Sequence, residues 1–163
     1  MTKLASNDVI ENAHSILQNA LRQGRFELLE PEAREFVRAF GITTPGYRVA
    51  TSAADAVQAA ASIGFPVVLK IVSPNISHKT DVGGVKIGIH NNKGVKAAYE
   101  EIIKNVQKNR PDAMIRGVIV SEMALPAPEV IIGGLRDPQF GPAVMFGLGG
   151  VFVEIFKDVS FRI

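Results

Sequence analysis

The sequence has no cysteine among its 163 residues, so disulfide bridges, thiolate zinc sites and cysteine nucleophiles are excluded. It also lacks any apolar run of membrane-spanning length. Its first residues are polar and acidic, where a secretory signal peptide requires an apolar core. We therefore predict a cytoplasmic protein with no membrane partner.

Acidic and basic side chains nearly balance, with 16 of the former and 18 of the latter. The formal net charge is only +2, and no basic run is interleaved with aromatic side chains, so nothing indicates a nucleic-acid partner. With 47% hydrophobic and 21% charged residues, the composition is that of an ordinary folded chain. Its length suits one domain, or two small lobes that share a cleft.

What the sequence does contain is an unusual stretch from Gly64 to His90. It opens with a short apolar run, PVVLKI at 66–71, which predicts a buried strand. Strand periodicity places Lys70 on the face opposite Leu69. A mid-strand lysine among aliphatic residues either extends its ammonium group to water or contacts an anion, because an unpaired buried charge is costly.

A polar loop at 73–81 follows this strand and carries His78. Gly83 and Gly84 come next, before a second strand that begins at Val85. An ammonium group, backbone N–H groups left accessible by glycine and an imidazole nucleophile are together typical of a phosphate site. The alternatives are a solvated loop histidine and a glycine pair that only makes a hairpin turn. We expect residues 73–84 to be mobile without ligand, because they offer little apolar area to hold them in place.

The segment FPVVLKIVSPNISHKTDVGGVKIGI closely resembles the ATP-grasp domain of NDP-forming acyl-CoA synthetases, particularly that of the β subunits of ADP-forming acetate–CoA ligases. The resemblance extends through GVIVSEMA (117–124), EVIIGGLRDPQFGPAVMFGLGG (129–150) and VFVEIFKDVSFR (151–162). It covers the chain from residue 28 or so to its last residues.

The resemblance implies an acid–thiol ligase that converts acyl-CoA, ADP and phosphate reversibly into a carboxylic acid, CoA and ATP. Acyl phosphate would form on a CoA-binding α subunit or domain, and His78 would carry the phosphoryl group to ADP as a phosphohistidine. A hetero- or homo-oligomer is the expected assembly. A second interpretation is a non-catalytic, ligand-sensing ATP-grasp module, like the domains that are fused to protein acetyltransferases.

The resemblance also implies a set of nucleotide contacts. Lys70, in the strand at 66–71, would contact the α- and β-phosphates, and the strand at 117–124 would contact the adenine. For Glu122 and Glu129, the alternative is that they are only solvated side chains at a strand edge. The implied contacts for ATP or ADP are Lys70, Gly83, Gly84, Val85, Glu122, Met123 and Glu129.

Magnesium is the second cofactor that the resemblance implies, and Glu154 is the candidate ligand in this chain. The acidic ELDINP-like segment that supplies metal ligands in the family does not occur before residue 163. We therefore expect a domain truncated at its C-terminus, with an incomplete metal site. Because phosphoryl transfer depends on the metal, the isolated chain is expected to be inactive.

Periodicity and capping residues predict an α+β fold, interpreted as an ATP-grasp first lobe with an incomplete second lobe. We divide the chain into an N-terminal helix (1–26), a first lobe with its preceding helix (27–116) and an incomplete second lobe (117–163). Helices are expected at 6–23, 31–40, 52–63 and 95–106. Strands are expected at 47–50, 66–71, 85–90, 118–123, 129–135, 142–146 and 151–156, the last four as an antiparallel meander.

Overall fold

The computed structural model describes residues 6–150 and 159–162. The chain divides into two compact units, the first up to Ala124 and the second from Leu125 onwards. Within the described residues the elements of the first unit are α1 (Asn7–Arg22), α2 (Glu30–Ala39), β1 (Tyr47–Ala50), α3 (Ala53–Ile63), β2 (Val67–Val72), β3 (Val85–Ile89), α4 (Asn92–Asn109) and β4 (Gly117–Glu122).

The ends of these helices follow their local chemistry. Ser52 Oγ accepts a hydrogen bond from the backbone N–H of Asp55, and Asn91 Oδ1 accepts one from that of Gly94, so both side chains cap the helices that follow them. Ser6 precedes α1 without a side-chain cap bond. The predicted α+β composition and the predicted helices of this unit are confirmed.

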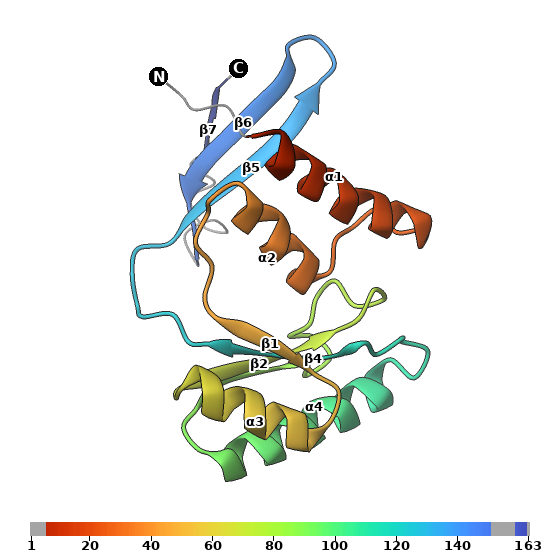
Figure 1. Ribbon diagram of the computed structural model, residues 1–163, viewed down its shortest axis with the longest axis vertical. Helices are drawn as coiled ribbons and strands as arrows, with labels where there is room; N and C mark the ends of the chain where they lie inside the picture. The colour runs from red at the N-terminus through yellow and green to blue at the C-terminus, as the bar shows by residue number, and fades with distance from the viewer. Residues whose placement is uncertain (1–5, 151–158, 163) are drawn as a thin grey trace. The chain divides into compact units, whose positions relative to one another are not determined.

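The four-stranded sheet of the first unit has the order β1-β4-β2-β3, and all its pairings are antiparallel. Figure 1 shows α3 and α4 on one face of this sheet and α2 on the other. The core lies between the sheet and the α3–α4 pair, where Val67, Leu69 and Ile71 are fully buried. The predicted alternation along β2 is thereby confirmed, and Lys70 faces the side of α2.

The strand β4 departs from the sequence-based division of the chain. We expected residues from 117 onwards to open the second lobe, but β4 pairs with both β1 and β2 in the first sheet. Its residues Gly117 to Ser121 are buried, as expected for a central strand. The short connection from β4 to the next strand had suggested that the two strands pair. Instead, the apolar strand β4 is buried on both faces, as is typical of a strand in the middle of a sheet.

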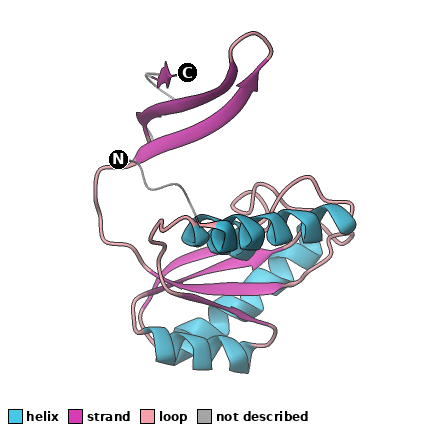
Figure 2. Cartoon of the chain, turned by 45° about the horizontal axis from the view of Figure 1, so that its top comes forward, coloured by secondary structure: helices cyan, strands magenta, loops and turns pink. Residues whose placement is uncertain are grey.

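The second unit contains β5 (Val130–Asp137), β6 (Gly141–Leu148) and β7 (Val159–Arg162) among its described residues. They form an antiparallel three-stranded sheet in the order β5-β6-β7, and Figure 2 shows strands and loops in this unit. The predicted strands at 129–135 and 142–146 are confirmed. The predicted strand at 151–156 lies outside the described residues.

None of the helices in the described part of the chain is long and apolar enough to cross a membrane.

Candidate functional site

The side chain of Lys70 meets an anion. Lys70 lies in the interior of β2, and its side chain is 32% exposed. Its Nζ donates a hydrogen bond to Glu30 Oε1 at 3.1 Å. Of the two possibilities that the sequence left open, the contact with an anion is the one that the structure shows.

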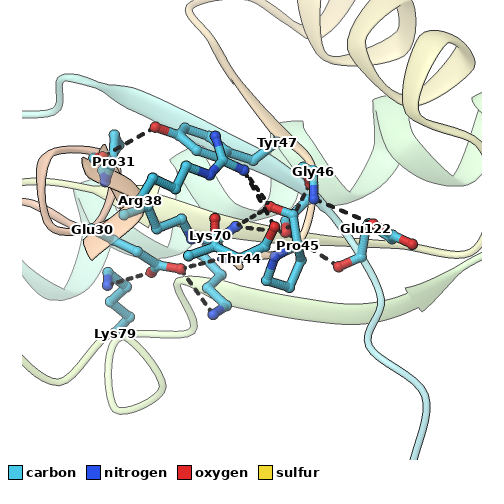
Figure 3. A network of polar contacts seen from close by, with 12 residues as sticks. Glu30, Pro31, Arg38, Thr44, Pro45, Gly46, Tyr47, Lys70, Lys79 and Glu122 are labelled. Atoms are coloured by element: carbon cyan, nitrogen blue, oxygen red, sulfur yellow. Dashed lines mark hydrogen bonds and ion pairs between the residues drawn. The ribbon is translucent and has the colours of Figure 1, made fainter. Parts of the chain in front are cut away.

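Glu30 collects three cationic side chains. Its Oε1 accepts hydrogen bonds from Lys70 and, at 2.8 Å, from Arg34, and its Oε2 accepts one from Lys79 Nζ at 2.9 Å. Figure 3 shows the Glu30 carboxylate joined by dashed lines to Lys70 and Lys79. Burial opposes ionisation of Glu30, but the hydrogen bond from Lys79 and the charge of Lys70 outweigh it and lower its pKa to about 2. The carboxylate is therefore ionised at neutral pH.

The position of Glu30 is set by the start of α2. Glu30 is the first residue of the helix and Pro31 follows it, which suits the fixed φ of proline. A carboxylate in the first turn also interacts favourably with the helix dipole. The turn is braced by Glu32, whose carboxylate accepts a hydrogen bond from the Leu29 backbone N–H at 2.8 Å and forms an ion pair with Arg25 at 2.6 Å.

Two arginines tie α2 to the sheet. Arg34 Nη1 donates to Ser121 Oγ at 2.9 Å, and Ser121 is buried in β4. The guanidinium groups of Arg34 and Arg38 both lie 5.0 Å from the centroid of the Tyr47 ring in β1. Burial, together with its hydrogen bond to Glu35, raises the pKa of Tyr47 to about 12. These contacts fix α2, and with it the Glu30 carboxylate, over β1 and β4.

The segment that joins β2 to β3 is anchored to the first unit near its start. Ile76 is only 5% exposed and belongs to the core of the first unit. Asn75 Oδ1 accepts a hydrogen bond from the Met114 backbone N–H at 2.9 Å. Our expectation that the segment has little apolar area to hold it is therefore wrong for the residues up to Ile76. Beyond it, His78 is exposed and Lys79 is half-buried against Glu30.

The backbone donors of the glycine pair are engaged within this segment. The N–H of Gly83 donates to the Thr80 carbonyl at 3.0 Å, and the N–H of Gly84 donates to the Lys79 carbonyl at 2.8 Å. Phosphate binding by these two groups, as the family resemblance implies, therefore requires them to exchange partners.

Close packing explains why both positions are glycine. A Cβ at Gly84 would lie 2.6 Å from Ile71 Cγ2 and 2.9 Å from the Lys79 carbonyl oxygen. Gly83 has a φ of +67°, and a Cβ there would lie 2.8 Å from Asn105 Nδ2. Val85, the next implied nucleotide contact, pairs directly with Lys70 in the sheet.

A pocket of about 670 Å³ lies beside this cluster. Its lining includes Glu30, Ser77 and Lys79 together with Arg25 and Arg116. Its wall is made by the connection between α1 and α2 and by the segment after β2. The pocket therefore gives the Lys79 end of the segment an open, polar surrounding.

The implied adenine contacts stand at the end of β4. Glu122 Oε2 accepts a hydrogen bond from the Gly46 backbone N–H at 3.2 Å, and the Glu122 N–H donates to the Gly46 carbonyl at 2.9 Å. The Met123 N–H donates to the Pro66 carbonyl at 3.3 Å. Both residues thus tie the end of β4 to the residues that precede β1 and β2.

The remaining predicted residues belong to the second unit. The Glu129 carbonyl accepts a hydrogen bond from the Gly149 N–H at 2.8 Å, and Glu129 Oε2 lies 3.0 Å from the Cβ that a side chain at Gly150 would have. Glu154 lies outside the described residues. Within 6–150 and 159–162, no three His, Asp or Glu side chains converge on a metal-binding position, so no magnesium ligands are assigned there.

Sequence reasoning proposed Lys70 and His78 as site residues but did not point to Glu30, which contacts Lys70 in the structure. A glutamate at the start of a helix is fully explained by the helix dipole, so its residue type carries no further signal. Its two lysine partners are 40 and 49 residues away. Only the docking of α2 on the sheet brings the three together.

The chain is similar in sequence to known proteins. A family model described as an ATP-grasp domain matches residues 19–163. The chain is 50% identical over 156 residues to the subunit beta of acetate–CoA ligase (ADP-forming) I from Pyrococcus furiosus, covering 96% of this chain and 67% of that one.

The chain is also similar to solved structures of related proteins. The chain resembles the dinucleotide forming acetyl-coenzyme A synthetase 1 of Ca. Korarchaeum cryptofilum in complex with coenzyme A and Ca-AMPCP, with TM-score 0.89, 55% identity and coverage of 92% of this chain and 66% of that chain. A second complex of that protein, with coenzyme A and Mg-AMPPCP, has its phosphohistidine segment pointing towards the nucleotide binding site. It matches with TM-score 0.77, 50% identity and coverage of 92% and 63%. The chain thus spans about two thirds of the length of these relatives.

Proposed function

Because the chain belongs to the ATP-grasp domain family, we propose that it is the nucleotide-binding part of the β subunit of an ADP-forming acyl-CoA synthetase. The reaction would be acyl-CoA + ADP + phosphate ⇌ carboxylic acid + CoA + ATP. The observation that carries the proposal is the cluster of Lys70 and Lys79 around a single anion, with the exposed His78 next to Lys79 in the sequence. The names of the relatives, which are ADP-forming ligases, support it.

In the proposed reaction the phosphoryl group moves in two steps. A ring nitrogen of His78 attacks the phosphorus of an acyl phosphate formed on a CoA-binding α partner. The bond between phosphorus and the acyl oxygen breaks, and the carboxylate leaves. A terminal oxygen of ADP then attacks the phosphorus, the bond between phosphorus and nitrogen breaks, and ATP and neutral histidine result. The phosphohistidine segment described for the Korarchaeum enzyme supports this role for the loop.

The lysines would neutralise charge during both steps. Lys70 is fixed on β2 and suits the phosphates of a bound nucleotide, and Lys79 adjoins His78 and suits the group in transit. Magnesium, when bound with the nucleotide, supplies further charge compensation. We propose Glu154 as one of its ligands, and we propose that Val85, Glu122, Met123 and Glu129 contact the nucleotide.

The test is ATP formation from acyl-CoA, ADP and phosphate by a complete β chain that carries this sequence, assembled with its α subunit. We expect His78→Ala to abolish ATP formation while ADP binding persists. His90→Ala, at the exposed end of β3, is the matched control and should stay active. Activity retained by the His78 variant would rule out the relay.

A further inference from the structure

One carboxylate bridges a fixed lysine and a loop lysine. Lys70 stands on β2, whose backbone is paired on both sides. Lys79 stands in the segment after β2, next to His78. Each lysine contacts a different oxygen of Glu30, Oε1 at 3.1 Å and Oε2 at 2.9 Å. The two ammonium groups thus surround an anion that the chain itself supplies.

A phosphate group offers the two lysines the same kind of oxygen acceptors as this carboxylate. Its oxygens accept charge-assisted hydrogen bonds from ammonium groups at similar distances, and a diphosphate carries more negative charge. A phosphate bound to both lysines would lie close to the Glu30 carboxylate, and the two anions would repel each other. A phosphate at this place and the Glu30 carboxylate are therefore competitors.

We propose that Glu30 is a positioning residue that holds Lys79, and with it the His78 segment, until a phosphate group displaces its carboxylate from the two lysines. This inference rests on the proposed function and extends it to the control of the segment. In this proposal the Glu30–Lys79 contact acts as a latch: it restrains the His78 segment, and phosphate bound at the two lysines releases it.

The displaced carboxylate does not become an isolated charge. Arg34 Nη2 contacts Glu30 Oε1 at 2.8 Å and is itself held by Ser121. Glu30 also stays at the N-terminus of α2, where the helix dipole favours a negative charge. Its side chain is 18% exposed, so water reaches it. Release of the two lysines therefore leaves Glu30 with a partner, which makes the exchange feasible.

Release has a mechanical consequence for the segment. Ile76 anchors one end in the core, and the hydrogen bonds of Gly83 and Gly84 close the other end. Between these anchors, the Lys79 side chain is bonded to α2 through Glu30. Loss of this bond frees the part that carries His78 while the anchors stay in place.

A merely structural ion pair predicts the opposite effect on anion binding. If Glu30 only positions the lysines, replacing it should weaken the binding of phosphate compounds or leave it unchanged. If Glu30 competes with phosphate, replacing it should strengthen that binding. The sign of the change therefore separates the two roles.

The experiment compares the wild-type chain, Glu30→Gln and the control Glu35→Gln. Glu35 lies on the same helix and pairs with Arg38, not with the lysines, so the control makes the same change in net charge. Inorganic pyrophosphate is titrated by calorimetry. We expect Glu30→Gln to bind it about fivefold tighter or more, as competition between two ligands implies, and Glu35→Gln to match the wild type.

Amide hydrogen exchange provides the second measurement. Without ligand, residues 77–82 should exchange several times faster in Glu30→Gln than in the wild type, and added pyrophosphate should accelerate exchange there in the wild type. In a Lys79→Met background, Glu30→Gln should leave the exchange of 77–82 unchanged, because the latch is already open. Slow exchange in β2 and β4 verifies the fold in each variant.

Pyrophosphate binding to Glu30→Gln that equals or falls below that of the wild type, in a folded variant, overturns the inference. Should Glu30→Gln not fold, Glu30→Asp serves instead. It keeps the charge beside Arg34 but is one methylene shorter, so it should change both measurements in the same direction. ADP is titrated in parallel. ADP binding no tighter than pyrophosphate binding counts against the proposed function, and the pyrophosphate comparison still decides the role of Glu30.

Discussion

Glu30 Oε1 lies 3.1 Å from Lys70 Nζ, although 40 residues separate them in the sequence. The contact joins the first residue of α2 to the interior of β2 on the sheet face opposite the α3–α4 pair. A lysine that strand periodicity directs away from the core thereby becomes part of a charged cluster. The consequences of this arrangement for binding and stability are measurable.

Lys70→Ala should weaken nucleotide binding, because it removes a charge-assisted contact worth about 1.5–3 kcal/mol. Isothermal titration with ADP measures the effect. The control is Lys86→Ala, in β3 of the same sheet, whose ammonium group pairs with Glu101 at 2.6 Å. Equal ADP affinity in Lys70→Ala and the wild type would contradict the assignment of Lys70 to the phosphates.

Gly84→Ala should destabilise the first unit by about 1–3 kcal/mol, as overpacking of a tight site does. Its Cβ would lie 2.6 Å from Ile71 Cγ2, whereas a Cβ at Gly46, the control site, would meet its nearest atom at 3.7 Å. Urea unfolding followed by tyrosine fluorescence reports this unit, because both tyrosines of the chain, Tyr47 and Tyr99, belong to it. A Gly84→Ala midpoint like that of Gly46→Ala would show that the site relaxes freely.

Acid should unfold the first unit partly through Glu30. The pKa of Glu30 falls from 4.5 to about 2 on folding, so the unfolded state binds more protons between these values. The stabilisation is complete above pH 4.5 and is lost as pH falls towards 2, by up to about 3 kcal/mol. The free energy of unfolding of Glu30→Gln should therefore depend less on pH in this window than that of Glu35→Gln. Parallel pH profiles of the two variants would disprove the coupling.

Mobility in the segment after β2 should be confined to residues 77–82. Ile76 is buried, and the N–H groups of Gly83 and Gly84 are hydrogen-bonded, so amides at both anchors should exchange slowly. Hydrogen exchange read residue by residue, without ligand and with pyrophosphate, measures this. Exchange in 77–82 as slow as in β2 in both states would contradict a segment that carries phosphate between sites.

The helices, the strands and the orientation of Lys70 follow from local sequence signals. The run PVVLKI specifies a strand with its lysine on the non-core face, and Ser52 and Asn91 mark helix starts, because these signals act within a few residues. The family was also recognisable from the SHKTDVGGV motif. Local chemistry is sufficient for such inferences.

The partners of these elements and side chains depend on tertiary packing. The strand β4 joins the first sheet because both its faces need burial, and no local pattern names β1 and β2 as its neighbours. Glycine at position 84 reflects the approach of Ile71 from the adjacent strand. Glu30 gains Lys70 and Lys79 only when α2 docks on the sheet, since the energy of an ion pair depends on a distance in space that sequence separation does not set.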